Sequence, residues 1–324
     1  MNLAVIVVSY NTCDLLRASL NSVIGAAETG AAGLDVDIVV VDNASHDGSA
    51  EMVAADFPQV TLLTSGENLG FTAANNLALS HLGFGSNADQ SPDFVLLLNP
   101  DAEVLPDTLD QMLAVFSTNP GAGVCGANLS YGDGAFQHGA FHFPSLFQVA
   151  LDFFPLAGMR GAHRLHNSGL NGRYSQQLWQ GDQPFQVDFV LGAAMMVRGA
   201  AIHDVGLLDE RFFMYCEEMD WCLRMQEGGW AVYAAPEARV IHHEARSSRQ
   251  VRWSAYERLW RSRFQFYAKH ANRYPPATLA PLRALVRLAL GYRTRQAQGR
   301  FADGQITGVE LSAELDAYRA IRKL

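Results

Sequence analysis

The sequence predicts an α/β protein with a mostly parallel central sheet flanked by helices, followed by a helical C-terminal extension. Three observations support this fold class. Apolar runs of strand length alternate with segments of helical spacing through the first 120 residues. The run Phe94–Leu98 is apolar at every position, as expected of a strand that is buried on both faces. Polar residues follow each run, which places them at one edge of the sheet.

The first 120 residues predict strands and helices joined by short links. The expected strands are 3–8, 36–41, 60–63 and 94–98. The expected helices are 14–23, 49–56, 71–82 and 107–116, with a loop of small residues over 25–33. Because parallel neighbours need a crossover between them, this order predicts a parallel sheet with helices on both sides.

The second half of the sequence is less regular. Residues 121–182 are rich in Gly, His, Phe and Asn without clear periodicity, which predicts an irregular excursion. An apolar strand is expected over 187–197, where Gly192 lets backbone approach a ligand closely. Another strand is expected at 231–233. Helices are expected from near Cys216 and over 253–270, 279–290 and 308–324.

Composition narrows the classes of protein. The formal net charge of −9 argues against nucleic acid as the main partner, because backbone phosphates need a basic surface. The four cysteines show no CxxC pairing, which predicts reduced thiols in a cytoplasmic protein. No apolar run reaches the roughly 18 residues that a membrane-spanning helix needs. We therefore expect a soluble protein that is still able to touch a membrane surface.

Polar side chains stand at the ends of four predicted strands. They are Ser9 and Asn11, Asp42 and Asn43, Asn68, and Asn99 with Asp101. One polar strand end is routine, but four at one edge indicate a crevice for a polar ligand. No GxGxxG follows the first strand and no GxxxxGK[ST] occurs, which disfavours a dinucleotide fold or a phosphate-loop NTPase.

Two groups of carboxylates are candidates for chemistry. Asp101 and Glu103 follow a buried strand, where oxygen ligands can bind a hard cation and, through it, a phosphate; the alternative is a polar turn. Glu217, Glu218 and Asp220 lie within four positions at the start of a predicted helix. A carboxylate beside apolar walls has a raised pKa, which suits a general base. The alternative is a capping cluster in which Asp220 pairs with Arg224.

Four motifs coincide with the predicted strand ends: VVSYN at 7–11, VVVDNAS at 39–45, ENLGFTAANN at 67–76 and LLLNPDAEV at 96–104. In this order and spacing the chain resembles glycosyltransferase family 2, and within it the bacterial rhamnosyltransferase-like branch. The resemblance covers about residues 3–248. It implies the GT-A fold, an inverting glycosyltransferase and a divalent metal, Mg²⁺ or Mn²⁺. It also implies a glycosyltransferase domain over 1–250, with a nucleotide-sugar half at 1–120 and an acceptor half at 121–250, before a helical extension at 251–324.

The resemblance implies roles for individual residues. Asp42 would accept a hydrogen bond from a pyrimidine N–H. Asp101 and His242 would hold the metal, with His243 as the second choice. The family pattern Glu-Asp-x-Asp places the base at Glu218, where this chain has Glu instead of Asp, so Glu217 and Asp220 remain candidates. The other nucleotide-sugar-binding candidates are Ser9, Asn11, Asn43, Asn68, Gly70, Asn75, Asn99 and Gly192.

The resemblance also implies substrates. It favours dTDP-L-rhamnose as donor, with UDP-hexoses open, and a cell-surface polysaccharide or lipid-linked glycan as acceptor. Arginines and aromatics over 246–270 suit either packing on the catalytic domain or peripheral contact with the inner face of the cell membrane. Two alternatives remain: a catalytically silent sugar-nucleotide-binding module, and a sugar nucleotidyltransferase. The latter would normally show an early Gly- and Arg/Lys-rich loop, which SYNTCDLL lacks.

Overall fold

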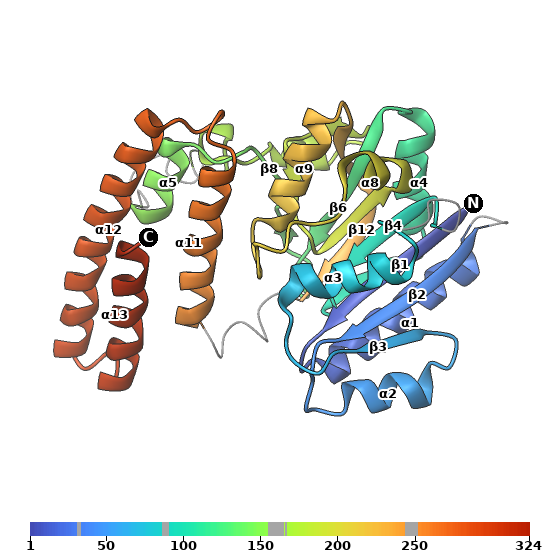
Figure 1. Cartoon of the computed structure of the whole chain (residues 1–324), viewed down its shortest axis with the longest axis horizontal. Helices are drawn as coiled ribbons and strands as arrows, with labels where there is room; N and C mark the ends of the chain where they lie inside the picture. Colours follow the sequence, from blue (N-terminus) through green and yellow to red (C-terminus); the bar gives the residue numbers. More distant parts are fainter. Residues whose placement is uncertain (31–33, 86–90, 155–164, 166, 244–251) are drawn as a thin grey trace. The chain divides into compact units, whose positions relative to one another are not determined.

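The computed structural model describes residues 1–30, 34–85, 91–154, 165, 167–243 and 252–324. The chain divides into two compact units (Figure 1). The sheet unit comprises Met1–Phe143, Arg173–Phe213 and Glu217–Ala245. The helical unit comprises Pro144–Gly172, Met214–Cys216 and Arg246–Leu324.

The sheet unit contains strands and helices in alternation. Its strands are β1 (Asn2–Ser9), β2 (Asp35–Asp42), β3 (Thr61–Thr64), β4 (Phe94–Leu98), β5 (Ala102–Val104), β6 (Ala122–Ser130), β7 (Phe136–Gln137), β8 (Ala140–Phe141), β9 (Phe185–Gln186), β10 (Phe189–Val190), β11 (Ala194–Arg198) and β12 (Ala231–His242). Its helices are α1 (Cys13–Thr29), α2 (Ser49–Asp56), α3 (Gly70–His81), α4 (Thr108–Thr118), α7 (Gln176–Trp179), α8 (Gly199–Val205) and α9 (Glu217–Glu227).

The main sheet runs in the order β3-β2-β1-β4-β11-β6-β12-β5, with β7 beside β6 and β9 beside β12. Strands β3, β2, β1 and β4 are mutually parallel, and β11 joins the sheet antiparallel to β4 and β6. The short strands β8 and β10 form a separate antiparallel pair. The predicted α/β class, a mostly parallel central sheet flanked by helices, is confirmed.

Alternation along the central strands produces two apolar layers. In β1, Leu3, Val5 and Val7 pack into the layer under α1, α2 and α4, while Ile6 and Val8 pack into the layer under α3, α8 and α9. The same division holds along β4. Successive side chains of a strand point to opposite faces of the sheet. Because helices cover both faces, these strands are apolar at every position.

Two segments of the prediction differ from the structure in the type of element. Helix α1 continues to Thr29, because the alanine-rich stretch predicted as a loop favours helix and buries Ala26. Residues 122–130, predicted as irregular, form the buried strand β6. This strand uses small residues because a Cβ at Gly126 would lie 2.5 Å from Val190 and one at Gly123 2.6 Å from Trp230.

Two strand predictions also need correction. The stretch 187–197 is not one strand: β10 and β11 are separated at 191–193, around Gly192. By contrast, β12 is longer than predicted and continues through Pro236, where its register to β6 shifts between Ala235 and Arg239. A bulge of this kind accommodates a proline that has no N–H to donate to the ladder.

The helical unit is built from α5 (Leu146–Phe153), the 3₁₀ turn η2 (Gly169–Asn171), α11 (Arg252–Lys269), α12 (Pro276–Ala302) and α13 (Gly308–Arg322). Aromatic rings join these helices: Phe153 stacks on Trp260, and Trp253 meets Tyr318 edge-on. The aromatics of α11 therefore pack within this unit. Glu314 is buried, and each of its carboxylate oxygens accepts a hydrogen bond from Arg300 at 2.8 Å. Among the described residues, no helix has the length and apolar character to cross a membrane.

Candidate active site

The carboxyl ends of β1 and β2 place Ser9 beside Asp42, as predicted. The Asn43 N–H donates to the Ser9 carbonyl at 2.8 Å, which locks the two strand ends together. Asp42 is 4% exposed, and its Oδ2 accepts from the Ser45 N–H at 3.1 Å. Its buried Oδ1 has no hydrogen-bond partner among the described residues. A buried carboxylate oxygen without a partner is costly, so this position favours a ligand that donates an N–H.

The asparagine side chains at the strand ends form hydrogen bonds mainly with the backbone of neighbouring loops. Asn43 donates through Nδ2 to Asn68 Oδ1 at 3.2 Å and to the Gly70 carbonyl at 3.1 Å, and its Oδ1 accepts from the Leu69 N–H. Asn11, with φ 53°, accepts from the His46 N–H at 2.8 Å. Buried Asn75 donates to the Phe71 carbonyl at 2.8 Å. These amides shape the crevice by fixing its backbone.

Gly70 begins α3 at a tight contact. Its φ is +81°, and a Cβ at this position would lie 2.4 Å from the Phe213 carbonyl oxygen and 2.7 Å from the Phe213 ring. The Phe71 N–H donates to the same carbonyl at 2.8 Å. Only glycine fits both the left-handed backbone and this approach. The segment that leads into α9 is thereby attached to the start of α3.

Asp101 and His242, predicted as metal ligands, lie side by side. His242 is the last residue of β12, which pairs with β5 directly after Asp101. Its Nε2 lies 3.3 Å from Asp101 Oδ1 and 3.3 Å from Asn99 Nδ2. Its Nδ1 lies 3.1 Å from Gln137 Oε1. When Nδ1 carries the proton and donates to Gln137, Nε2 presents its lone pair toward Asp101.

This pair fits a divalent cation. Two electron-rich atoms facing each other at 3.3 Å are stabilised by a positive charge between them, and a carboxylate with an imidazole suits a manganese-like ion. Among the described residues, no cluster of three or more His, Cys, Asp or Glu side chains could hold a metal. Glu103 and His243, the other candidates, pair with each other at 2.6 Å.

Glu217 and Glu218 open α9, the first with a buried side chain and the second with a half-buried one. Burial, and then the neighbouring Glu218 carboxylate, raise the pKa of Glu217 well above its ordinary value of 4.5. Burial raises the pKa of Glu218 to about 7. Glu217 is 5% exposed, whereas Glu218 is half-buried and thus closer to solvent. Each keeps one buried oxygen, Oε2, without a hydrogen-bond partner among the described residues. Of the two, Glu218 is the more accessible carboxyl.

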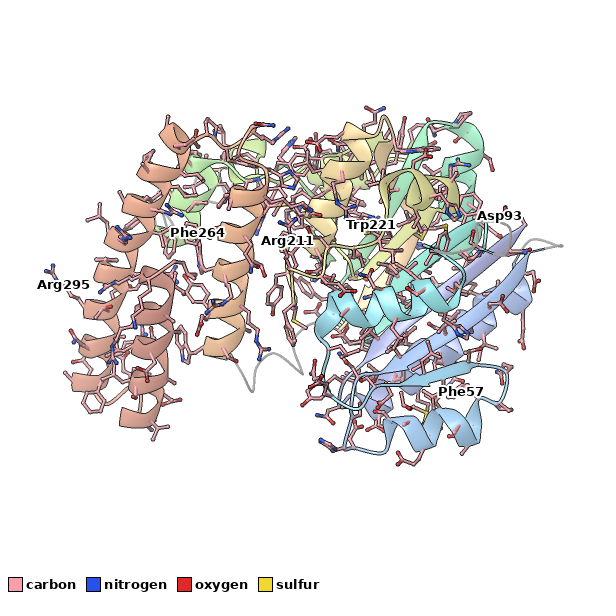
Figure 2. The ribbon with its side chains drawn as sticks, in the orientation of Figure 1. Phe57, Asp93, Arg211, Trp221, Phe264 and Arg295 are labelled. Atoms are coloured by element: carbon pink, nitrogen blue, oxygen red, sulfur yellow. The ribbon has the colours of Figure 1, made fainter. Side chains whose placement is uncertain are left out.

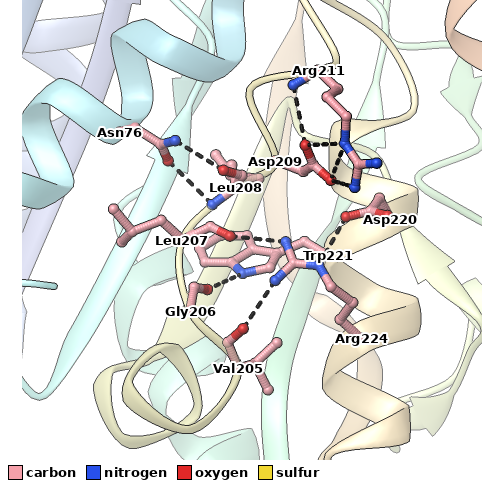
Figure 3. Close-up of polar contacts among 10 residues, drawn as sticks. All are labelled: Asn76, Val205, Gly206, Leu207, Leu208, Asp209, Arg211, Asp220, Trp221 and Arg224. Carbon is pink, nitrogen blue, oxygen red and sulfur yellow. Dashed lines mark hydrogen bonds and ion pairs between the residues drawn. The ribbon is translucent and has the colours of Figure 1, made fainter. Parts of the chain in front are cut away.

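Asp220, the third carboxylate, lies in a network of hydrogen bonds with Arg224 and the loop after α8 (Figure 3). It is fully buried and accepts from Arg224 Nε at 2.8 Å, one turn later on α9. Arg224 also donates to the Val205 carbonyl at 3.0 Å and to the Leu207 carbonyl at 2.8 Å. In the same network, the Trp221 indole donates to the Gly206 carbonyl at 2.9 Å. Asp220 therefore anchors α9 to the loop after α8.

The backbone before α9 is strained. Tyr215 and Cys216 have φ of 71° and 67°, a left-handed conformation that is unusual for two consecutive residues other than glycine. Each such residue costs on the order of 1–3 kcal/mol, and such strain is concentrated at functional sites. Both residues directly precede Glu217 in the sequence.

Contacts connect the acidic pair to the strand ends. A Cβ at Gly192 would lie 3.8 Å from Glu218 Cβ and 3.8 Å from the Phe71 ring. The neighbouring Ala193 carbonyl accepts from the Asn99 N–H at 2.9 Å. A chain of contacts therefore links Glu218 to Asp101. It runs from Gly192 and Ala193 to Asn99, and from Asn99 through His242 to Asp101. Residues from β1, β2, β4, β12 and α9 line this one edge of the sheet.

Two features were missed in the sequence. Gln137, buried at 5% exposure, orients His242 but lies in the segment predicted as irregular, which offered no periodic signal. The left-handed pair Tyr215–Cys216 also had no sequence signal, because neither residue type favours this conformation.

Comparison with solved structures agrees with this geometry. The mannosyltransferase PcManGT from Pyrobaculum calidifontis, solved with GDP-Man and Mn²⁺, superposes with a TM-score of 0.54 at 16% identity over 99% of this chain and 86% of that one. GalNAc-T7, solved with UDP, GalNAc and Mn²⁺, gives 0.50 at 14% identity over 75% and 44%. The fold is that of the GT-A glycosyltransferases.

Sequence comparison identifies the family. The model of glycosyl transferase family 2 matches residues 4–180, and the chain belongs to this family. An N-acetylglucosaminyl-diphospho-decaprenol L-rhamnosyltransferase from Mycobacterium tuberculosis is 30% identical over 90% of this chain and 91% of that protein. The dTDP-rhamnosyl transferase RfbF of Shigella flexneri is 21% identical over 63% and 59%. The predicted resemblance is confirmed, and the protein is a rhamnosyltransferase-like glycosyltransferase.

Proposed function

We propose that the protein transfers L-rhamnose from dTDP-L-rhamnose to a hydroxyl of a lipid-linked glycan, with inversion at the anomeric carbon. The Mycobacterium tuberculosis relative is named for L-rhamnosyl transfer to an N-acetylglucosaminyl-diphospho-decaprenol, which supports this sugar and this acceptor class. The chain is similar to that relative over nearly its whole length. The name of the dTDP-rhamnosyl transferase RfbF supports dTDP as the nucleotide. A UDP-hexose remains the alternative donor.

The single observation that carries the proposal is the environment of Glu218. An acceptor hydroxyl must lose its proton as it attacks, and a base works best with a pKa near the operating pH. The pKa of about 7 at Glu218 meets this requirement, whereas buried Glu217 and ion-paired Asp220 are less available. We assign Glu218 as the base. Direct attack by the activated hydroxyl on the anomeric carbon gives inversion.

The strand ends would hold the donor. Asp42 Oδ1, buried and without a partner among the described residues, can accept from the N3–H of a thymine or uracil ring. We assign Ser9, Asn11, Asn43, Asn68, Gly70 and Asn75 to the walls of the nucleoside site, and Asn99 and Gly192 to the sugar side. Asp42 thereby selects pyrimidine nucleotides, which include both dTDP and UDP.

Asp101 and His242 would hold the Mg²⁺ or Mn²⁺ ion, with Gln137 orienting His242. When bound, such an ion neutralises the charge of the diphosphate leaving group. The domain assignment also remains a proposal: residues 1–250 as the transferase domain, with halves 1–120 and 121–250, and 251–324 as an extension. We place the reaction at the inner, cytoplasmic face of the membrane, where lipid-linked acceptors would be reached.

The test compares donors and follows both products. The purified chain is incubated with Mn²⁺, a polyprenyl-diphospho-GlcNAc acceptor and, in turn, dTDP-L-rhamnose, UDP-glucose, UDP-galactose and GDP-mannose. We expect dTDP release and a rhamnosylated lipid only with the first donor, and an inverted anomeric configuration by NMR. Transfer from a UDP-hexose alone would overturn the donor assignment, and a retained configuration would overturn the mechanism.

Glu218→Gln separates catalysis from binding. This variant should lose transfer by roughly 10²–10⁴-fold while its melting temperature still rises with dTDP, because the base is removed and the nucleoside site is untouched. Full activity in the variant would remove Glu218 from this role. If the unmodified chain binds dTDP-L-rhamnose but never turns it over with any acceptor, the protein is a silent binding module instead.

A further inference from the structure

Helix α12 carries apolar side chains on two opposite faces. One face is buried in the helical unit and includes Leu282, Val286 and Leu290. On the opposite side, Leu288 is 72% exposed and Tyr292 is 51% exposed, with Ala284 exposed one turn before Leu288. Spacing by four residues aligns these three along the outer face. A helix in water ordinarily presents polar residues on its outer face, so this apolar stripe calls for a partner.

Cationic side chains border the stripe. Arg295 lies seven positions after Leu288, on the same face, and Figure 2 shows it extending outward from the helix. Arg287, also exposed, precedes Leu288 on the flank. Ion pairs of the helical unit use other arginines, such as Arg300 with Glu314. Within the described part of the chain, Arg287 and Arg295 have no ion pair.

The net charge of the segment points to an anionic partner. Residues 252–324 carry 14 Arg and Lys against five Asp and Glu, a formal net charge of +9. The preceding residues, 1–251, carry ten Arg and Lys against 28 Asp and Glu, a formal net charge of −18. The overall charge of −9 thus hides a strongly basic helical segment. Such a segment is attracted to anionic phospholipid, while the remainder of the chain is repelled.

We propose that the outer face of α12 binds the surface of an anionic phospholipid bilayer, with Leu288 and Tyr292 inserted among the headgroups and Arg287 and Arg295 pairing with lipid phosphates. A narrow apolar stripe with flanking arginines suits shallow insertion of a helix that lies in the interface plane. Tyrosine is suited to this depth because its ring is apolar and its hydroxyl is polar. A neighbouring exposed ring, Phe154, lies 6.0 Å from Tyr292 and widens the apolar surface.

This surface differs from the 246–270 segment predicted from the sequence. Three of the aromatics of α11, namely Trp260, Phe266 and Tyr267, are buried and cannot enter a bilayer, and residues 246–251 lie outside the described residues. A second copy of the chain is a less favoured occupant, because a stripe one residue wide offers little of the roughly 1,000 Å² that a stable protein interface buries. The inference depends on neither the donor nor the acceptor proposed above.

The test uses the full chain and sucrose-loaded vesicles, without donor or acceptor. We expect the protein to sediment with vesicles of mixed phosphatidylglycerol and phosphatidylcholine at low salt, and to remain in solution with phosphatidylcholine alone. Arg287→Glu combined with Arg295→Glu should weaken partitioning by at least roughly tenfold, because each cation near the surface contributes roughly fivefold. Leu288→Asp should weaken it to a similar extent.

Matched controls separate the local surface from overall charge and fold. Val309→Asp makes the same chemical change at an 82% exposed apolar residue on α13, and should leave partitioning unchanged. Arg319→Glu, at a 64% exposed arginine that pairs with Asp316, should have a much smaller effect than reversal at α12. Equal losses in the controls, or equal binding to neutral vesicles, would overturn the proposal. So would a dimer in light scattering that Leu288→Asp dissociates while vesicle binding persists.

Discussion

Arg224 holds Asp220 in a buried ion pair: its Nε lies 2.8 Å from Asp220 Oδ2, and the exposed fractions of the two side chains are 18% and 0%. The same guanidinium donates to two backbone carbonyls of the loop after α8 (Figure 3). An ion pair whose members are both committed in this way has little freedom to accept a proton from a substrate. Asp220, two positions after Glu218, is therefore part of the scaffold that supports it.

Asp220→Asn should destabilise the protein. The change removes the charge that compensates the partly buried Arg224 guanidinium, which costs about 3 kcal/mol in the free energy of unfolding. Urea denaturation measures this change, and Asp316→Asn is the control, since that residue and Arg319 are both exposed and should change stability by less than about 1 kcal/mol. A variant that keeps full stability but loses transfer would make Asp220 the base.

The dependence of kcat on pH should follow Glu218. A base is active when deprotonated, so kcat should rise about tenfold per pH unit below the pKa of about 7 and level off above it. Glu218→Asp introduces the residue typical of the family. Its kcat should still rise with pH and then level off, but with the inflection at a different pH. A rate that is flat from pH 5.5 to 8 (roughly) would show that another group takes the proton.

Stability should depend on pH through Glu217. Its folded-state pKa is raised above the ordinary 4.5, so the folded state favours the protonated carboxyl. The stability this group contributes is complete below pH 4.5 and is lost as the pH rises through the folded-state value. Glu217→Gln removes the ionisation and should raise the free energy of unfolding at alkaline pH, with little gain at acidic pH.

The control for that measurement is Glu51→Gln, at an exposed position on α2. Chemical denaturation of the three proteins across the pH range compares their slopes. Only Glu217→Gln should flatten the decline on the alkaline side. If its curve runs parallel to that of the unmodified protein, Glu217 is ionised in the folded state and the carboxyl pair needs a different account.

Two glycines with similar backbone and different surroundings test the contact between α3 and Phe213. Gly48 has φ +84° and a Cβ added there would meet no atom within 4 Å, so Gly48→Ala should cost only about 1 kcal/mol of stability. Gly70 has φ +81° and a Cβ there would meet Phe213 at 2.4 Å, so Gly70→Ala should cost about 3 kcal/mol or more. Equal losses in thermal denaturation would show that the Phe213 segment moves aside freely.

The sequence indicated the parallel half of the sheet well because its strands are apolar throughout and end at polar residues. Ser9, Asp42 and Asn99 could be placed at one edge for that reason. The other half of the sheet could not be predicted in this way. Strand β6 contains glycines that let Val190 and Trp230 pack against its backbone, and small residues do not indicate a strand.

Chemistry could be predicted from the sequence only as a set of candidates. Glu217, Glu218 and Asp220 are equivalent by spacing, and only burial and partners separate them: one carboxyl is enclosed, one half-buried and one ion-paired. Likewise, pairing of Asp101 with His242 required β12 to return beside β5, a contact between residues 141 positions apart that no local pattern reports.

Gln137 provides the last test, because it touches the proposed metal ligand and not the metal. Its Oε1 lies 3.1 Å from His242 Nδ1, and in the tautomer that protonates Nδ1 it accepts this hydrogen bond and leaves the Nε2 lone pair facing Asp101. Loss of such a supporting hydrogen bond typically weakens metal affinity roughly 10–100-fold. Gln137→Ala should therefore weaken Mn²⁺ binding in the presence of dTDP by about that factor, as measured by calorimetry and by the Mn²⁺-dependent rise in melting temperature. Glu103→Gln is the control, since that carboxylate pairs with His243 and should leave Mn²⁺ affinity unchanged. An unchanged affinity in Gln137→Ala, with a loss in Glu103→Gln, would transfer the metal site from the Asp101–His242 pair to the Glu103–His243 pair.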